Sequence, residues 1–546
     1  MIINKLSTQE LQDLIGVSIL DRLKDILPSL PESGIENPND VYEKAFLIKI
    51  FLSFQGQDSF LKKNFRMMLL NRLSDDEIKK LAELLELNSN LGFDRLVKDI
   101  SNINWEHNEQ TKRMIKYFNL PIDYLPEPKE ELPNVETIKC HERPFKLLKD
   151  FQFKVFMNAM TILENPMKRF VIQMPTGSGK TRTAMEIVTS FLIKNPGKSV
   201  IWLAHSDELC EQAVECFKDV WMHVGTFDID IVRAWGKNNL KVQKRSSFVV
   251  AGFPKINSIL KKNMELIKRF ANNNILVIVD EAHKAIARTY KKVIESLVIN
   301  SSNVPHLIGL TATPGRSDVD SKETKKLIEF FFKDKIEIDS GSKTVFQYLR
   351  DKKILSHIEN EPISGRRYEL SASEKNYIET YFDFPEGFLK RVSDDDVRNL
   401  EIIKKLKKEC ELNKKILFFG TSIEHSKFIC ALLNFLGFKA EHIDGLTRID
   451  RRRNIIKNFK ERSNNLNIIC NYGVLTTGFD APMIDVVFIA RPTMSVVLYS
   501  QMVGRGLRGP AIGGTESCKL IDVKDNIDVY RSPDNVYDYF ESYWKG

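Results

Sequence analysis

Eight consecutive residues from Met174 to Thr181, MPTGSGKT, have the types and the spacing that a phosphate chain requires. Gly177 and Gly179 allow a tight turn in which backbone amides face phosphate oxygens. Lys180 can reach the β- and γ-phosphates, Thr181 can ligate Mg²⁺, and a following helix adds its dipole. We therefore expect a nucleotide site formed by Pro175, Thr176, Gly177, Ser178, Gly179, Lys180 and Thr181, although Met174 stands where the general pattern has glycine.

A second group, DEAH at Asp280 to His283, directly follows the apolar run ILVIV. A carboxylate at the C-terminal end of a strand in an α/β domain points into the ligand crevice. Asp280 would hold Mg²⁺ through water, and Glu281 would orient and polarise the attacking water. The alternative is a solvated acidic turn, and the phosphate loop in the same chain argues against it. The two groups together predict ATP hydrolysis with Mg²⁺ as cofactor.

Short apolar strands that alternate with helices must position these residues. The expected strands are 169–174, 199–204, 248–251, 275–279 and 307–311 in a first series, and 415–419, 467–470, 485–490 and 519–523 in a second. Strands of this kind form parallel sheets that are covered on both faces. The expected fold class is therefore α/β, with two tandem parallel-sheet domains.

The region before the first strand series has a different pattern. Residues 1–120 have helical periodicity and include the capping-box sequence Ser74 to Glu77, so we expect an all-helical N-terminal domain. Four prolines from Pro121 to Pro133 indicate a linker. The expected organisation is a helical accessory domain at 1–120, a proline-rich linker at 121–139, a first α/β domain at 140–338, an interdomain segment at 339–400 and a second α/β domain at 401–546.

Composition excludes several classes of protein. The 546 residues are 42% hydrophobic and 28% charged, which is ordinary for a globular protein, and the net charge of +8 permits nucleic-acid binding without requiring it. The seven cysteines show no CxxC pair, which argues against a zinc ribbon or a disulfide framework. We find no signal peptide and no apolar run long enough to span a membrane, so we expect a cytoplasmic protein with no membrane partner.

In their order and spacing, the two chemical groups resemble motifs of the superfamily 2 helicases. Further stretches resemble that family's motifs in the same order: LLKDFQ, LAHSDELCEQA, FVVAGFPKI, GLTATPG, ILFFGTS, NYGVLTTGFDAP and QMVGRGLRGP. The resemblance covers about residues 145 to 525, and it is strongest to the branch that holds XPB-type, RadD-type and type III restriction translocating subunits. It implies that both α/β domains are RecA-like and that they bind one ATP.

The resemblance extends the ATP site beyond the two groups. Gln152 matches the glutamine that reads the adenine edge, and Gly478 and Asp480 match residues that join the ATP site. Arg505 and Arg508 are candidate arginine fingers, because a cation lowers the energy of the γ-phosphoryl transition state. The residues that match the last motif are Gln501, Gly504, Arg505 and Arg508. Of these, we expect Gln501, Arg505 and Arg508 to act in catalysis with Glu281.

The resemblance also implies coupling and nucleic-acid contacts. His283, Thr311 and Thr313 would couple hydrolysis to movement of the bound strand. The expected nucleic-acid contacts are His205, Thr421, Ser422 and Thr476, with a structural role as the simpler interpretation of His205 and a turn hydroxyl as the alternative for Thr421 and Ser422. The sequence departs from the family pattern at three positions, Asp207, Gly252 and Thr477.

A basic run from Arg448 to Arg462 has two interpretations. A solvated helix face is the simpler one, and phosphate contacts with nucleic acid are the alternative. Overall we expect an ATP-dependent helicase or translocase, with DNA favoured over RNA by branch resemblance alone. An RNA helicase and an ATP-gated scaffold without directional movement are the alternatives. We expect the N-terminal helices to dock a protein partner or to gate the motor, and antiviral defence is a hypothesis by analogy.

Overall fold

The computed structural model describes residues 2–126, 128, 133–139, 147–298, 305–315, 321–381, 383–461, 466–475 and 483–525. The chain forms two compact units, and each unit combines segments that are distant in sequence. The first unit contains Met1–Glu131, Glu386–Gly473 and Phe488–Arg491. The second unit contains Leu132–Pro385, Val474–Val487 and Pro492–Gly546.

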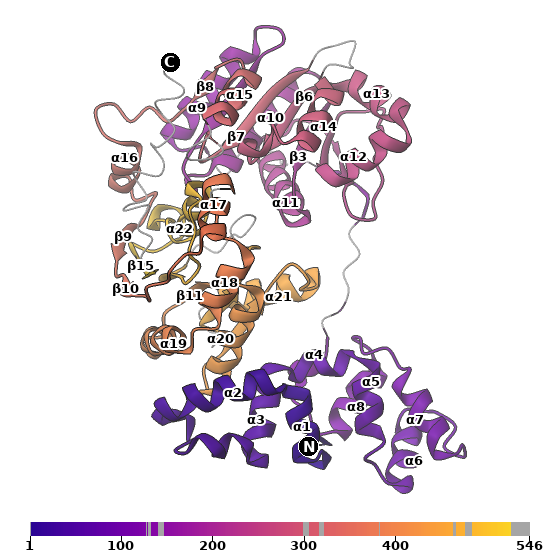
Figure 1. The fold of residues 1–546 in the computed structure, drawn as a ribbon. Coiled ribbons are helices and arrows are strands. Elements are labelled where there is room, and N and C mark those ends of the chain that lie inside the picture. The colour runs from indigo at the N-terminus through magenta and orange to yellow at the C-terminus, as the bar shows by residue number, and fades with distance from the viewer. Residues whose placement is uncertain are drawn as a thin grey trace. The chain divides into compact units, whose positions relative to one another are not determined.

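Eight strands form one sheet in the second unit (Figure 1). They are β1 (Val135–Ile138), β2 (Arg169–Gln173), β3 (Ser199–Ala204), β4 (Ile229–Ala234), β5 (Ser247–Gly252), β6 (Asn274–Asp280), β7 (His306–Thr311) and β8 (Lys335–Ile336). Their order is β1-β4-β5-β3-β6-β7-β2-β8, and all neighbours are parallel except β1 and β4. The five strands expected in the first series are all present.

Helices cover both faces of this sheet, because alternate strand residues face two separate cores. Phe170 and Ile172 face a core that also contains residues of α9 (Asp150–Leu163), α10 (Lys180–Lys194) and α11 (Asp207–Val224). Val171 faces a second core with residues of α12 (Phe253–Lys262), α13 (Met264–Asn273), α14 (Arg288–Val298) and α15 (Ser321–Phe330). Near-continuous apolar strands are what a parallel sheet buried on both faces requires.

A second sheet contains the strands of the second series. These are β11 (Ile416–Phe419), β12 (Ala440–Ile443), β13 (Ile468–Asn471), β14 (Val486–Ile489) and β15 (Ser517–Lys524), with the short β9 (His357–Asn360) and β10 (Ile363–Ser364). The order is β10-β15-β14-β11-β13-β12, and β9 pairs with β15. The four strands expected here are present, and the ladders that β13 forms with β11 and β12 are parallel. The expected fold class, two parallel-sheet RecA-like domains after a helical region, is confirmed.

The remaining helices of the second α/β region and of the segment before it are short or of medium length. They are α16 (Val345–Asp351), α17 (Ala372–Tyr381), α18 (Glu386–Ser393), α19 (Asp396–Glu411), α20 (Ile423–Phe435), α21 (Ile449–Lys460) and α22 (Val496–Val503). In the first unit, α20 contacts β12 and β13. The sheet therefore carries a helical layer that other elements can pack against.

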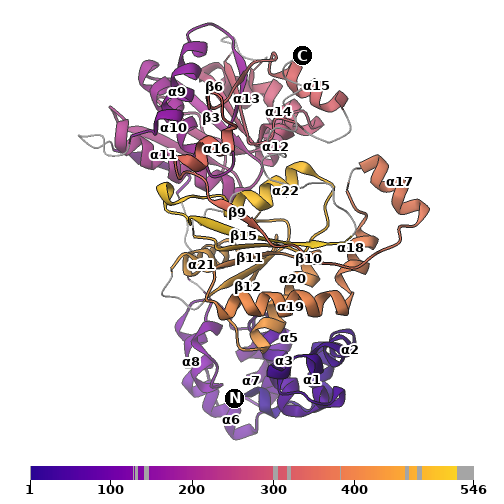
Figure 2. The same ribbon diagram turned by 90° about the vertical axis from the view of Figure 1, so that its left-hand side faces the viewer.

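The N-terminal region is helical, as expected. Its helices are α1 (Thr8–Ile15), α2 (Val17–Ile26), α3 (Lys44–Phe54), α4 (Gly56–Leu61), α5 (Lys63–Leu70), α6 (Asp75–Leu84), α7 (Phe93–Ser101) and α8 (Glu109–Tyr117). Ser74 and Glu77 form the capping box that the sequence indicates. Within the first unit, α2 packs against α19 and α3 packs against α20 (Figure 2). The N-terminal helices are therefore part of one compact body with strands β11 to β13.

Among the strands that the sequence does not predict, β4 and β12 are interrupted by charged residues. β4 (IDIVRA) contains Asp230, which pairs with Arg245, and Arg233, which pairs with Glu136. β12 (AEHI) contains Glu441, which pairs with Arg451. Charged side chains are buried only when they are paired, and these partners lie elsewhere in the sequence. Within the segment expected as a linker, Val135–Ile138 form β1 and pair with β4.

Candidate active site

The phosphate loop joins β2 to α10, as the sequence predicts. Gly177 and Gly179 have φ values of 85° and 86°, a backbone region in which glycine is not strained. Gly179 is the N-cap of α10, which begins at Lys180. The Ser178 hydroxyl donates to the carbonyl of Pro175 at 2.7 Å, which closes the turn. The loop thus has the strand, turn and helix N-terminus that bind a phosphate chain.

Gln152 in α9 contacts this loop directly. Its side-chain amide donates to the carbonyl of Ser178 at 3.0 Å, and its side-chain oxygen accepts from the backbone amide of Lys149 at 3.0 Å. A Cβ atom at Gly179 would lie 2.2 Å from the Gln152 amide nitrogen, so a larger residue there would displace the end of the Gln152 side chain. Gln152 therefore supports the phosphate loop in this structure, and its expected contact with adenine stays a prediction.

The DEAH group lies at the end of β6. Glu281 has φ 53°, a left-handed conformation that is strained for a residue with a side chain. Its backbone amide donates to the Asp280 carboxylate at 3.0 Å, and Ala282–Lys284 form a short 3-10 helix. The turn begins at Asp280, the last residue of β6, which lies beside Leu310 of β7 at the carboxyl edge of the sheet. Backbone strain of this kind concentrates at functional sites. The residue types alone do not predict that Glu281 has a left-handed conformation.

Burial sets the protonation of this group. Burial raises the pKa of Asp280 to about 6, although the Lys180 ammonium opposes the shift. Burial also opposes ionisation of Glu281, but the surrounding positive charges, Lys180 foremost, outweigh it and lower the pKa of Glu281 to about 2. Burial lowers the pKa of His283 to about 3, so its imidazole is neutral near pH 7. Glu281 is therefore an ionised acceptor beside a neutral histidine.

His283 connects the DEAH group to the end of β7. Its Nδ1 lies 3.3 Å from a Glu281 carboxylate oxygen and 3.3 Å from the Thr311 hydroxyl. The Thr311 hydroxyl donates its hydrogen to the carbonyl of Thr313 at 2.8 Å, so Nδ1 must carry the proton that it shares with Thr311. The backbone amide of Met174 in turn donates to the carbonyl of Thr311 at 3.2 Å. His283 and Thr311, which are both expected to couple hydrolysis to movement, are thus in contact, and the bonds of Thr311 reach the start of the phosphate loop.

The last motif lies against the phosphate loop within the second unit. α22 ends at Val503, and Gly504–Gly506 follow as a 3-10 turn. A Cβ atom at Gly504 would lie 2.7 Å from Cβ of Thr176, and one at Gly177 would lie 3.4 Å from Cγ of Arg508. Two glycines therefore permit a close approach that brings Arg508 to the loop. Gln501 and Arg505 belong to the same stretch, and both are half-buried.

A segment that we expected to lie between the two domains holds the backbone on both sides of Arg508. The Ser356 amide donates to the carbonyl of Leu507 at 2.9 Å, and the Ser356 hydroxyl contacts the carbonyls of Arg508 and Thr515. The amide of Gly509 donates to the carbonyl of Ile354 at 2.8 Å. Residues 354–356 are thus part of the candidate site, and their only sequence signal is an ordinary Ile-Leu-Ser.

The residues expected to touch nucleic acid have intramolecular partners. His205 Nε2 lies 3.1 Å from the Lys284 ammonium, and burial together with this cation lowers its pKa to about 4. Thr421 is fully buried, and its hydroxyl donates to the carbonyl of Ala490 at 3.1 Å. Ser422 caps α20 by accepting from the amide of His425 at 3.0 Å. Thr476, Gly478 and Asp480 lie outside the described residues.

The basic run at 448–462 is partly used inside the first unit. Arg451 lies 2.9 Å from the Asp58 carboxylate and 3.5 Å from that of Glu441, and the buried Arg452 donates to the carbonyl of Asp444 at 2.8 Å. At these two positions the run is neither a solvated face nor a free phosphate-binding surface.

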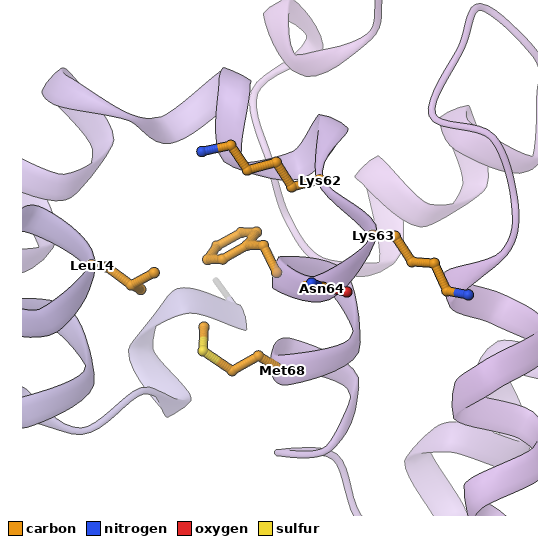
Figure 3. Close-up of a pocket in the computed structure, with 6 residues that line it drawn as sticks. Leu14, Lys62, Lys63, Asn64 and Met68 are labelled. Carbon is orange, nitrogen blue, oxygen red and sulfur yellow. The ribbon is translucent and has the colours of Figure 1, made fainter.

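A pocket of about 540 Å³ lies in the N-terminal helices (Figure 3). Leu14, Phe65 and Met68 give it an apolar wall, and Lys62 and Lys63 lie at its edge. None of the residues of the phosphate site lines it.

The donor set of the second unit suits Mg²⁺. Asp280 offers a buried carboxylate and Thr181 offers a hydroxyl, and both are the hard oxygen ligands that Mg²⁺ prefers. Among the described residues, no group of three or more His, Cys, Asp or Glu side chains could hold a metal. Few protein ligands are typical of Mg²⁺ at nucleotide sites, because substrate phosphates and water complete its coordination. No helix in the described ranges has the length and the apolar composition to cross a bilayer.

Comparison with known families identifies the class of protein. Residues 145–316 match the family described as Type III restriction enzyme, res subunit, and residues 399–509 match the Helicase conserved C-terminal domain. These ranges include the phosphate loop, the DEAH group, Arg505 and Arg508. The chain belongs to the superfamily 2 helicases. Within this class, its first α/β domain matches the res-subunit family of type III restriction enzymes.

Individual relatives are distant. The chain is 26% identical over 411 residues to the Saccharomyces cerevisiae protein named "Putative ATP-dependent helicase IRC3", which covers 72% of this chain and 53% of the relative. The chain thus spans about half the length of that relative. It is 27% identical over 378 residues to the "51.5 kDa protein" of a Lactococcus phage, which covers 69% of this chain and 70% of the relative. A solved structure titled "The fragment structure of a putative HsdR subunit of a type I restriction enzyme from Vibrio vulnificus YJ016" is similar, with a TM-score of 0.48 and 18% identity, covering 76% of this chain and 69% of that one.

Proposed function

We propose that the chain is an ATP-dependent translocase or helicase that moves on DNA. Membership of the superfamily 2 helicases supports a nucleic-acid-dependent ATPase. The choice of DNA over RNA rests on the similarity of the first α/β domain to the res subunit of type III restriction enzymes. Cytoplasmic location and a role in antiviral defence stay predictions.

The single observation that carries the proposal is the close approach of the last motif to the phosphate loop. A Cβ at Gly504 would lie 2.7 Å from Thr176, and Cγ of Arg508 would lie 3.4 Å from a Cβ at Gly177. In this position Arg508 can share the negative charge of the γ-phosphoryl group as its bond to the β-phosphate breaks. Arg505 is the second candidate for this role.

The other residues of the site have separate tasks in the proposed reaction. Lys180 and the loop amides bind the phosphates, and Thr181 and Asp280 would hold Mg²⁺, which supplies positive charge between the β- and γ-phosphates. Glu281 is ionised near neutral pH because its pKa is lowered to about 2, so its carboxylate can accept a hydrogen bond from the attacking water and orient it.

Coupling to movement would pass through His283. Its Nδ1 lies 3.3 Å from both Glu281 and the Thr311 hydroxyl, so a change in what Glu281 binds alters a bond to the end of β7. ATP and ADP favour different conformations only to the extent that they bind them differently, and this bridge is a direct route for that difference.

The test is the steady-state ATPase rate over a panel of single-stranded, duplex and forked DNA and the matched RNAs. We expect strong stimulation by DNA and weak stimulation by RNA. Lys180→Ala should remove the activity, whereas Lys194→Ala, at the exposed end of the same helix, should keep it.

Each other outcome has a defined meaning. Stimulation by RNA alone would show an RNA helicase. ATP hydrolysis without stimulation by any nucleic acid would refute the motor and leave an ATP-gated scaffold. Retained hydrolysis in Lys180→Ala would refute the assignment of the site itself.

A further inference from the structure

The N-terminal helices match no motif, but one of their side chains, that of Arg22, packs against α19 and α20 of the second α/β region. Arg22 in α2 is only 17% exposed. Its guanidinium lies 3.9 Å from the centre of the Phe428 ring in α20, and its Nε donates to the Asp396 carboxylate at 2.9 Å. It also donates to the carbonyl of Ser393 at the end of α18 at 3.1 Å, and it lies 3.5 Å from the Asp394 carboxylate. An arginine that is stacked and bonded in this way is fixed in one conformation.

The Ser393 carbonyl begins a chain of buried hydrogen bonds. It also accepts from the side-chain amide of Asn399 at 2.9 Å. The side-chain oxygen of Asn399 lies 2.9 Å from Nε2 of His425. The backbone amide of Thr421 donates to Nδ1 of His425 at 3.0 Å. Asn399 and His425 are both buried.

The directions of these bonds are mutually consistent. Because Nδ1 of His425 accepts from the Thr421 amide, the imidazole proton must be on Nε2, where it is donated to the oxygen of Asn399. Asn399 then has its amide free to donate to Ser393. Burial, with the charges of Arg398 and Arg22, lowers the pKa of His425 well below its usual range, which keeps the imidazole neutral as this arrangement requires. A protonated Nδ1 could not accept the Thr421 amide.

This series of hydrogen bonds ends at the loop Gly420–Ser422, which lies between β11 and α20. Ser422 is the N-cap of α20 and is half-buried. The Ser422 oxygen accepts from the amide of His425, so its hydroxyl hydrogen stays available to a phosphate oxygen. This loop corresponds to the stretch that is proposed to contact the nucleic-acid backbone.

We propose that Arg22 is a positioning residue through which the N-terminal helices hold the loop Gly420–Ser422 in its nucleic-acid-binding conformation. This inference rests on the proposed function, because it assumes that the loop contacts nucleic acid. It assigns to the N-terminal helices a role inside the motor. Buried hydrogen-bond chains are rigid when every member is satisfied, so loss of one end loosens the other.

Another polar contact between the same helices and α19 gives a matched control. Lys407 in α19 pairs with Glu32 of the N-terminal region and with Glu411. In the described part of the chain, neither carboxylate bonds to Ser393, Asn399 or His425. Lys407→Ala therefore removes an ion pair of the same interface without touching the hydrogen-bond chain.

The experiment compares Arg22→Ala, Arg22→Lys and Lys407→Ala in the full chain. The readouts are the ATPase rate without nucleic acid, the single-stranded DNA concentration that gives half-maximal stimulation, and hydrogen exchange of the peptide that contains Thr421. We expect Arg22→Ala to leave the basal rate unchanged and to raise the half-maximal concentration by roughly three- to tenfold, the effect of losing about one ordinary hydrogen bond. Arg22→Lys should have an intermediate effect because lysine lacks the planar fork. Lys407→Ala should resemble the unmodified protein.

The outcomes separate this inference from the proposed function. If DNA stimulates the unmodified protein and Arg22→Ala behaves like Lys407→Ala, the positioning role is refuted. If no nucleic acid stimulates the unmodified protein, the proposed function fails, and hydrogen exchange decides the positioning role: faster exchange at Thr421 in Arg22→Ala alone supports it, and equal exchange refutes it. If Arg22→Ala does not fold, Arg22→Met, which keeps packing over Phe428 without the hydrogen bonds, takes its place with the same expected outcomes.

Discussion

The loops that follow β2 and β11 both leave the carboxyl end of a strand in a parallel sheet, but they differ in how their polar groups are bonded. Each connects the carboxyl end of a strand to the N-terminus of a helix. The loop after β2 has two glycines with positive φ and carries the phosphate motif. In the loop after β11, the amide of Thr421 binds His425 and its hydroxyl binds the carbonyl of Ala490.

This difference teaches that topology alone does not make a binding loop. Both positions lie where α/β sheets bind ligands. Only the loop after β2, with its two positive-φ glycines, turns tightly enough to direct successive amides at an anion. In the other loop the amide and hydroxyl of Thr421 are bonded within the protein, so its conformation depends on residues as distant as Arg22.

The largest expected effect comes from the group that completes the first loop. Arg508→Ala should lower the ATP hydrolysis rate by roughly a thousandfold or more, because a cation on the transferring phosphoryl group contributes that much. Single-turnover hydrolysis measures it, with circular dichroism to check folding. Arg95→Ala, an exposed arginine of α7, is the control. A near-normal rate in Arg508→Ala would remove the basis of the proposed site.

A smaller effect, on ATP binding, should follow when the glycine at position 179 in the first loop is replaced by alanine. Gly179→Ala places a Cβ 2.2 Å from the Gln152 amide at φ 86°, so we expect about tenfold weaker ATP binding, the loss of roughly one hydrogen bond. Gly197→Ala has φ 81° and meets nothing within 4 Å, so it tests strain without the clash. Both should destabilise the fold by about 1 kcal/mol. Isothermal titration with a non-hydrolysable ATP analogue would contradict this explanation if the two variants bound equally well.

The smallest effect should come from the second loop. Thr421→Val removes a buried hydroxyl that donates to the carbonyl of Ala490, and Arg398 also donates to that carbonyl at 2.6 Å. We expect a loss of about 1 kcal/mol of stability and little change in DNA affinity. Thr161→Val, whose exposed hydroxyl donates to the carbonyl of Met157 at 3.0 Å, should lose less. Weak DNA binding with unchanged stability would instead favour the phosphate contact expected from the sequence.

Much of the fold could be predicted from the sequence because buried parallel strands are almost wholly apolar. β2, β3 and β6 are recognisable as runs of Val, Ile and Leu with flanking turns. β4 and β12 were not recognisable, because Asp230, Arg233 and Glu441 look exposed until their partners are known. Pairing between distant residues is a property of the folded chain, and local pattern does not encode it.

Some parts of the candidate site could likewise be predicted from local sequence, and other parts could not. The phosphate loop and the DEAH group could be predicted because their chemistry depends on neighbouring residues in one turn. The contact of Gln152 with the Ser178 carbonyl and the bonds of Ser356 to the Arg508 stretch depend on the packing of separate elements. Arg22 had no local signal at all, since nothing in VSILDRLKDI distinguishes it from a surface arginine.

The bonds of residues 354–356 restrict how the arginine stretch can move. Ile354 and Ser356 are bonded to the backbone at Leu507, Arg508 and Gly509 by three hydrogen bonds, and we call residues 354–356 the splint. A displacement that withdrew Arg508 from the phosphate loop would have to carry this splint along or break three hydrogen bonds at once. Any flexing that opens the nucleotide site is therefore confined to chain outside the splint, and mutations at Ser356 should change how fast the product leaves.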